Sequence, residues 1–338
     1  MLSIIMMVGC AGNGAVPVPE MPSQGAAIPL PDDPHRQFDF WLGEWDVQNK
    51  HLREGDWNDS GTAVALIQAV VDGGAVLEQW NGELRGDPLI GFSLRAYDPE
   101  LGKWPVYLNW HGGRPGGFGL MIGSRNGESM ELFPPDSNTS RYTFSLVHED
   151  SCQWNQAHPT EDGGWTTDWV MQFTRRQPPL AVDASNAPIR QPPDSAAGFA
   201  QTRQLDFLIG AWSGTATELA ADGSEQQGAA QARVSSMIEG FGLLQFVDLG
   251  WGAKYFAALG HDGGAEAWVA LSADNRSDGI LRLVGEIADR TVTFSADTPE
   301  GEVVERWSCD GDRCRWVRSV HLDGRIVARV TADLERDE

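Results

Sequence analysis

The chain has little positive charge and no long apolar run. Its 338 residues include 25 Lys and Arg, only three of them Lys, against 48 Asp and Glu, for a formal net charge of −23. Such an excess of negative charge argues against nucleic acid or an anionic lipid surface as a partner. No stretch approaches the ~20 apolar residues of a membrane-spanning helix. The 41% hydrophobic content is nevertheless globular, which excludes a wholly disordered or collagen-like chain.

Common signatures of catalysis are missing as well. The sequence contains no G-x-S-x-G nucleophile elbow and no H-E-x-x-H motif. A glycine-rich segment begins at His111, but it lacks the GK[ST] ending and the following helix of a phosphate-binding loop. Acidic residues are abundant enough to leave an acid–base pair open. No set of residues demands one, so a binding role is favoured over an enzyme.

Glycine and tryptophan are abundant, with 39 and 14 residues, which suits an all-β protein with many turns. From residue 36 to residue 176, short apolar runs alternate with turn signals such as Asn126-Gly127. Sequential antiparallel strands joined by tight turns favour an up-and-down β-barrel of about ten strands that encloses a cavity. The strands are expected at 44–52, 61–71, 75–83, 89–98, 103–111, 117–125, 128–133, 141–149, 151–157 and 165–175.

An internal repeat indicates that this barrel occurs twice. Residues 36–45 and 203–212 share the frame RQxDFxxGxW, and the same spacing brings residues 71–78 onto residues 238–245. A segment with two Gln-Pro-Pro steps separates the copies, which is typical of a linker. The sequence therefore predicts tandem antiparallel barrels at 36–176 and 203–336, joined by a linker at 177–202.

The first ten residues have the pattern of an export signal. A short apolar run ends in Met7-Val8-Gly9-Cys10, which resembles a bacterial lipobox, whose cysteine becomes lipidated. The leader is short and lacks a basic residue, which also fits a truncated ordinary signal peptide or an apolar start without a targeting role. Residues 11–35 hold six prolines and are expected to form a tether. No Asp follows Cys10, so we expect an envelope lipoprotein that faces the periplasm and touches the outer membrane only through its anchor.

The opening motif also carries a family resemblance. Phe38-Asp-Phe-Trp-Leu-Gly-Glu-Trp45, followed by VLEQW at 76–80 and SLRAYDPELGKW at 93–104, is similar to an uncharacterised bacterial lipocalin-like family, a domain of unknown function. The similarity covers nearly all of the first domain and part of the second. More distantly, the chain resembles calycins, including haem-binding barrels of the nitrobindin type. The resemblance implies a barrel for a small, largely apolar ligand, without a settled activity.

The resemblance gives structural roles to the two GxW motifs. In calycins this tryptophan closes one end of the barrel, and an arginine from the last strand packs over its ring. Here Trp45 would receive Arg175 or Arg176, and Trp212 would receive Arg336. Each cation–π contact would be worth ~1 kcal/mol.

Candidate ligand residues lie on the central strands of the first domain. If they face inward, they form an aromatic lumen with one fixed cation, which suits an apolar ligand with an acidic group. Glu78 is the candidate partner of that cation, because an unpaired buried charge is costly. The alternative is that the aromatic side chains only fill the core. The set is Trp80, Arg95, Tyr97, Tyr107, Trp110 and, in a loop at the barrel mouth, His111.

The cysteines divide by position. Cys10 is the candidate lipidation site. Cys309 and Cys314 flank an Asp-Gly turn, and facing positions of a hairpin are close enough for a bridge. An exported protein is in an oxidising compartment, so we predict a disulfide between them. Cys152 is expected to be a buried strand thiol.

Three functions remain open. The leading interpretation is a lipoprotein that binds a small apolar or amphipathic molecule in one or both lumens. The second is haem binding or lumenal catalysis centred on His111 or His321. Nitrobindin-like barrels bind haem through a late histidine, which makes His321 the position that the resemblance favours, and no other cofactor is expected. The third is a structural or interaction module in which side chains fill both barrels.

Overall fold

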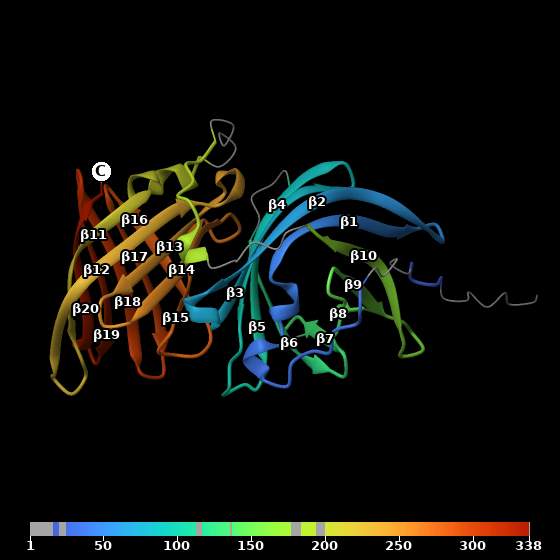
Figure 1. Cartoon of the computed structure of the whole chain (residues 1–338), viewed down its shortest axis with the longest axis horizontal. Coiled ribbons are helices and arrows are strands. Elements are labelled where there is room, and N and C mark those ends of the chain that lie inside the picture. The colour runs from blue at the N-terminus through green and yellow to red at the C-terminus, as the bar shows by residue number, and fades with distance from the viewer. Residues whose placement is uncertain are drawn as a thin grey trace, which may run out of the picture.

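Two closed β-barrels follow one another along the chain. The structure, a computed structural model, describes residues 16–19, 25–112, 117–135, 137–176, 184–193 and 200–337. Each barrel has ten antiparallel strands, which confirms the tandem all-β fold that the sequence predicts (Figure 1). No helix in the described part of the chain is long and apolar enough to cross a membrane. Cys10 lies outside the described residues.

Barrel 1 is a meander over residues 43–175, closed by pairing between its first and last strands. Three short 3-10 helices accompany it: η1 (Pro34–Arg36), η2 (Asp39–Trp41) and η3 (Val71–Gly73). Its strands are β1 (Gly43–Arg53), β2 (Asp56–Val70), β3 (Ala75–Leu84), β4 (Asp87–Ala96), β5 (Trp104–His111), β6 (Phe118–Asn126), β7 (Ser129–Phe133), β8 (Arg141–Ser145), β9 (Ser151–Pro159) and β10 (Trp165–Arg175).

Barrel 2 repeats this arrangement over residues 210–336, where β11 pairs with both β12 and β20. Asp98 and Asp262 occupy equivalent turns, and the Oδ1 of each accepts the backbone N–H groups two and three residues further on. The elements are η4 (Ala184–Asn186), η6 (Thr202–Leu208), β11 (Gly210–Leu219), β12 (Glu225–Ser236), η7 (Ile238–Gly240), β13 (Gly242–Leu249), β14 (Lys254–Asp262), β15 (Ala267–Asp274), β16 (Leu281–Ala288), β17 (Thr291–Thr298), β18 (Gly301–Asp310), β19 (Arg313–Leu322) and β20 (Arg325–Arg336).

Two strands of barrel 1 differ in length from the prediction. β2 begins before residue 61, because Glu54 and Gly55 both adopt positive φ and make a tight turn that extends the hairpin. The added segment is largely exposed, so it shows no apolar alternation. β8 stops at Ser145 rather than at residue 149, since Leu146 adopts a left-handed φ of 50°.

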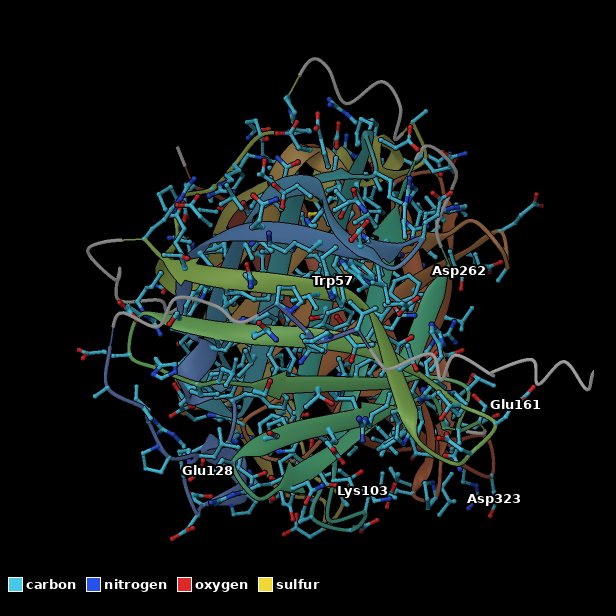
Figure 2. The ribbon with its side chains drawn as sticks, turned by 90° about the vertical axis from the view of Figure 1, so that its right-hand side faces the viewer. Trp57, Lys103, Glu128, Glu161, Asp262 and Asp323 are labelled. Atoms are coloured by element: carbon cyan, nitrogen blue, oxygen red, sulfur yellow. A yellow bond between two sulfur atoms is a disulfide. The ribbon has the colours of Figure 1, made fainter. Side chains whose placement is uncertain are left out.

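The strands of barrel 1 run between two different ends. We define the plug end by the turns that follow β2, β4, β6 and β8, and the mouth end by the turns that follow β1, β3, β5, β7 and β9. In Figure 2, Glu128 lies in a turn at the plug end and Glu161 in a turn at the mouth end.

The opening motif of each repeat closes the plug end. The Trp41 carbonyl of η2 accepts a hydrogen bond of 2.7 Å from Nε1 of Trp45. In barrel 2, Leu208 of η6 accepts one of 2.9 Å from Nε1 of Trp212. Both indole rings are buried, so they belong to the core beneath each lumen.

An arginine of the last strand stacks on each of these tryptophans. Of the two candidates for Trp45, the structure places Arg175 over the ring, 4.0 Å from its centroid. Arg176 instead pairs with carboxylates of β1 on the outer face. Arg336 lies 4.1 Å from the ring centroid of Trp212. Nη2 of Arg175 donates to the Phe40 carbonyl of η2 at 2.8 Å, and Nη2 of Arg336 donates to the Phe207 carbonyl of η6 at 2.9 Å.

The glycine of each GxW motif makes room for that arginine. Gly43 has a φ of +132°, and a Cβ placed on it would lie 2.5 Å from Nη1 of Arg175. Gly210 stands in the same relation to Arg336. Glycine, tryptophan and arginine therefore form one unit, which explains why the motif is repeated in both domains.

A disulfide joins Cys309 to Cys314, as the sequence predicts. The two residues are direct cross-strand partners in β18 and β19, with Cα atoms 4.1 Å apart. Cys152 is free and buried, and burial raises the pKa of its thiol well above its usual range.

The double substitution Cys309→Ser/Cys314→Ser should lower the free energy of unfolding by about 2 kcal/mol, a modest loss because the bridge closes only a short loop. Urea unfolding of the oxidised wild type and of the variant measures the difference, and the reduced wild type should behave like the variant. Labelling of both cysteines in unfolded, non-reduced protein would contradict the bridge.

The two barrels pack together through equivalent strands. One cluster of buried apolar side chains joins β3 and β4 to β13, β14 and β15. Leu77 and its repeat counterpart Leu244 both belong to this cluster, as do Phe92 and its counterpart Phe256. Part of the linker packs here too, where the Arg190 N–H donates to a serine of β12.

The turn after the second strand of each repeat reaches across this interface (Figure 1). Asp72 of η3 forms an ion pair of 2.5 Å with Lys254 and accepts a hydrogen bond from Asn275. Its counterpart in η7, Glu239, accepts one of 3.3 Å from Asn81. Both acidic residues have a φ of 59°. The contact is therefore approximately isologous, like that of a twofold dimer.

Candidate functional site

A cavity of about 330 Å³ occupies the lumen of barrel 1. Side chains alternate along a strand, so one face of each strand lines this space. At the plug end, the buried rings of Trp41 and Phe144 form its floor. Toward the mouth end, Leu89, Trp110 and Trp169 are only half-buried. The cavity is thus closed at the plug and is reached from the mouth.

A buried ion pair stands at the floor. Nη2 of Arg95 lies 3.3 Å from Oε2 of Glu78 and 2.5 Å from Oγ of Ser93. The Ser93 hydroxyl donates to the same carboxylate oxygen at 2.6 Å. Glu78 and Ser93 are direct partners across β3 and β4, which places them on one face. All three side chains belong to residues that are at most 4% exposed.

Part of the Arg95 guanidinium has no hydrogen-bond partner. Its Nε and Nη1 atoms are buried, and no described residue accepts a hydrogen bond from either. Nε1 of Trp41 is buried and unpaired in the same way. The guanidinium lies over the plug, 4.2 Å from the ring centroid of Trp41 and 4.8 Å from that of Phe38. Buried donors normally have acceptors, so these atoms need an explanation.

Burial also changes the ionisation of this pair. Desolvation raises the pKa of the Glu78 carboxyl, although Arg95 and Ser93 act in the opposite direction. Desolvation lowers the pKa of Arg95 to about 10, so the guanidinium is charged at neutral pH. The floor therefore holds a fixed cation beside a carboxyl group that binds a proton more tightly than usual.

Aromatic and thioether side chains form the walls. Tyr142 and Trp154 stack with ring centroids 5.4 Å apart, and Trp169 meets Trp154 edge-on at 5.0 Å. Met121 and Met171 add apolar surface that adapts to different shapes. Apolar walls with a few convergent polar groups are the usual composition of a small-molecule site.

His51 stands near the mouth end of β1. Its ring stacks on Trp169 with centroids 5.1 Å apart, and its Nδ1 lies 2.6 Å from Oγ of Ser60. Burial, helped by the charges of two nearby arginines, lowers the pKa of His51 to about 4, so its ring is neutral at physiological pH.

The candidate ligand residues from the sequence fall in different places. Arg95 and Trp110 line the cavity, and Trp80 is buried beside Trp110 with ring centroids 5.5 Å apart. Tyr97 packs at the plug end, 4.9 Å from the ring of His35. All four residues lie on the inward face of the barrel. Trp80 and Tyr97 do not line the cavity, but they pack against residues near it.

Tyr107 and His111 point to the opposite face of β5, toward barrel 2. Burial raises the pKa of Tyr107, against the effect of a barrel 2 arginine. Burial, and then the charge of His261 in barrel 2, lowers the pKa of His111. Both residues belong to the surroundings of the interface, so the lumenal site does not include them.

Several lining residues are not apparent from the sequence. Trp41 comes from the opening motif, Trp154 from β9 and Trp169 from β10, and the closure of the barrel brings them opposite β3 and β4. Ser93, two residues before Arg95, shares its face. Alternation along a strand could have identified Ser93, because a residue two positions before an inward-facing Arg95 must also face inward.

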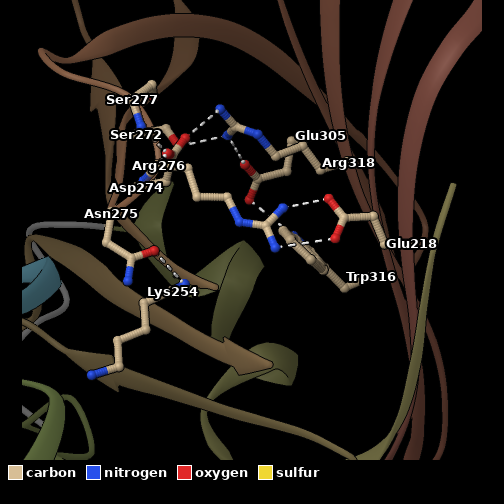
Figure 3. A network of polar contacts seen from close by, with 10 residues as sticks. All are labelled: Glu218, Lys254, Ser272, Asp274, Asn275, Arg276, Ser277, Glu305, Trp316 and Arg318. Carbon is tan, nitrogen blue, oxygen red and sulfur yellow. Dashed lines mark hydrogen bonds and ion pairs between the residues drawn. The ribbon is translucent and has the colours of Figure 1, made fainter. Parts of the chain in front are cut away.

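The lumen of barrel 2 carries a different polar network (Figure 3). Arg318 of β19 pairs with Glu305 at 3.3 Å and with Asp274 at 3.4 Å. Glu305 also accepts hydrogen bonds from Trp316 and from Gln245, at 3.1 and 2.6 Å. Both terminal nitrogens of Arg318 thus have acceptors, unlike those of Arg95. Gln245 is the repeat counterpart of Glu78, so the barrel 1 ion pair is not repeated.

The cavity residues do not fit a haem. No histidine or cysteine is among the described residues that line it, and its volume corresponds to on the order of ten water-sized groups, fewer than the atoms of a porphyrin. His321 lies in barrel 2, with its Nε2 2.8 Å from Oγ of Ser319. The described residues also include no group of three or more His, Cys, Asp or Glu that could hold a metal ion.

Comparison with known proteins finds similarity at the level of structure. No protein-family model and no curated protein matches the sequence. Among solved structures, the chain is similar to a protein of unknown function from the DUF3598 family of Nostoc punctiforme. The two chains are 14% identical over 89% of this chain and 97% of that chain, with a TM-score of 0.28. A match at this level assigns no function.

Proposed function

We propose that barrel 1 binds a small amphipathic molecule, with an acidic head at Arg95 and an apolar body between the aromatic walls. The observation that carries the proposal is the pair of unpartnered nitrogens on a buried guanidinium at the floor of a cavity. Hydrogen bonds from a guanidinium to a carboxylate are stronger than those between neutral groups. An acidic oxygen is therefore the acceptor that would gain most from this position.

The cavity limits the size of the ligand. A volume of about 330 Å³ is at the lower end of the ~300–1,000 Å³ of small-molecule pockets. At ~30 Å³ for each water-sized group, a body of about ten non-hydrogen atoms would fill it. Medium-chain and aryl-alkyl monocarboxylates combine this size with one acidic head.

The proposal also extends to location. An intramolecular disulfide is typical of proteins that fold outside the reducing cytosol. It supports the expectation that the chain is exported. The Met7-Val8-Gly9-Cys10 pattern is the basis for the proposal that a lipid on Cys10 holds the protein in the cell envelope. The lumen would then be open to ligands of the envelope.

The variant Glu78→Gln/Arg95→Met should bind octanoate about 10- to 100-fold more weakly than the wild type. The two substitutions keep a neutral, filled floor but remove the guanidinium, and loss of one charged hydrogen bond of ~1.5–3 kcal/mol corresponds to about this factor. Native mass spectrometry and quenching of tryptophan fluorescence measure the binding of octanoate, hexanoate and phenylbutyrate. The wild type should bind at least one of them, with one ligand per chain.

The matched control is the same chemical change in barrel 2, Glu305→Gln/Arg318→Met, which should leave the affinity unchanged. Absence of binding of all three acids to the wild type at millimolar concentration would refute the proposal. So would a loss of binding in the barrel 2 variant but not in the barrel 1 variant.

A further inference from the structure

We propose that barrel 1 takes up its acidic ligand together with one proton, which Glu78 receives as the ligand carboxylate replaces it as the counterion of Arg95. The inference rests on the proposed function and on the geometry of the floor. Glu78 holds only one edge of the guanidinium, through Nη2, while Nε and Nη1 remain unpartnered. A ligand head at either of those nitrogens would share one cation with the Glu78 carboxylate.

The balance of charge favours the exchange. An ionised Arg95 and an ionised Glu78 sum to zero, so a ligand carboxylate beside them would leave one negative charge uncompensated. Burial of such a charge is costly at a floor where both side chains are almost fully buried. With a proton on Glu78, the floor holds one cation, the Arg95 guanidinium, and one anion, the ligand carboxylate. The side-chain geometry already gives the Glu78 carboxyl a neutral neighbour, the Ser93 hydroxyl at 2.6 Å.

Glu78 is the carboxyl group of the floor that can carry this proton. The elements packed against it on the other sides, β2 and η2, offer Ile67 and Trp41, which do not ionise. Burial raises the pKa of Cys152, and the pKa of His51 is lowered to about 4, so both remain neutral between about pH 5.5 and 8.5. The ionisable side chains that line the cavity with Glu78 are Arg95 on β4 and Tyr142 on β8, and Cys152 on β9 belongs to the same buried cluster. Toward the mouth end, His51 on β1 stacks on Trp169, and His158 on β9 contacts Gln156 and the Asp168 carboxylate.

The second repeat provides a guide to a conservative variant. Gln245 stands at the position of Glu78, where its amide donates to Glu305 at 2.6 Å and accepts from Nε1 of Trp307 at 2.9 Å. An amide at this position is therefore compatible with the barrel. Glu78→Gln keeps the shape of the side chain and removes the group that would bind the proton.

Isothermal titration of the full chain with octanoate, from about pH 5.5 to 8.5 in buffers of different ionisation enthalpy, tests the inference. In the wild type the affinity should fall as the pH rises, approaching tenfold per pH unit, with uptake of about one proton per ligand at the upper end. In Glu78→Gln the affinity should be constant over this range, with no proton uptake. Octanamide, the neutral match of octanoate, should bind the wild type without proton uptake.

The outcomes separate this inference from the proposed function. Octanoate binding to the wild type without pH dependence would overturn the inference and keep the function. An unchanged pH dependence in Glu78→Gln would place the proton on another group or on the ligand, and would overturn it as well. Failure of octanoate, hexanoate and phenylbutyrate to bind at any pH would remove the proposed function itself. Melting temperatures across the range show whether the variant remains folded.

Discussion

Replacement of Arg95 by methionine should lower the free energy of unfolding by about 3–5 kcal/mol near neutral pH, the usual cost of removing one partner of a buried ion pair. Methionine retains much of the side-chain volume, but the Glu78 carboxylate is left in the core without its counterion. Urea unfolding, followed by far-UV circular dichroism and tryptophan fluorescence, measures the loss.

Two controls connect this loss to the charge. Addition of Glu78→Gln to Arg95→Met should recover most of the stability, because a neutral floor of similar volume needs no counterion. Burial raises the pKa of Glu78 and Arg95 lowers it, so the folded Arg95→Met variant should bind the Glu78 proton more tightly than the folded wild type does. The loss in Arg95→Met should therefore shrink as the pH falls and grow as it rises. A double variant as unstable as the single one would assign the effect to packing over the plug rings instead.

Trp45→Ala should lower the free energy of unfolding by a similar amount, about 3–5 kcal/mol, because a fully buried indole is removed from the plug. The change also leaves the Trp41 carbonyl without its 2.7 Å hydrogen bond and Arg175 without the ring 4.0 Å beneath it. Trp212→Ala removes the equivalent contacts in barrel 2 and should cost about as much. Thermal and urea unfolding of both variants measure these effects.

Trp57→Ala is the matched control, because this tryptophan of β2 is only half-buried and makes one hydrogen bond, to the Pro17 carbonyl. Its cost should be about 1 kcal/mol or less. If Trp45→Ala kept its melting temperature and lost octanoate binding, the indole would belong to the ligand site rather than to the plug.

The fold could be predicted because its signals are local and repeated. Tight turns punctuate short runs of alternating residues, and the RQxDFxxGxW frame occurs twice. These local signals did not reveal which faces of the two barrels pack against each other. The segment from Val76 to Trp80 is buried on both faces, since one face lines barrel 1 and the other packs on barrel 2. In the sequence it appears as an ordinary apolar strand.

The candidate site could be predicted only in part. Arg95 lies two residues after Ser93, the cross-strand partner of Glu78, so the sequence could pair the two charged residues. Tyr107 and Trp110 are three residues apart on one strand, and strict alternation puts them on opposite faces. That rule, applied to β5, is enough to separate the two side chains. Trp154 and Trp169 reach the cavity only because β10 closes on β1, a contact between opposite ends of the domain.

The approximately isologous interface has a consequence for how the two lumens can differ. In a true homodimer every substitution occurs twice, so a change that suits one lumen is imposed on the other. Here both halves lie in one polypeptide, and each position has its own codon. The carboxyl group at Glu78 can therefore coexist with the amide at Gln245, and the two barrels are free to hold unlike contents while their shared surface keeps them together.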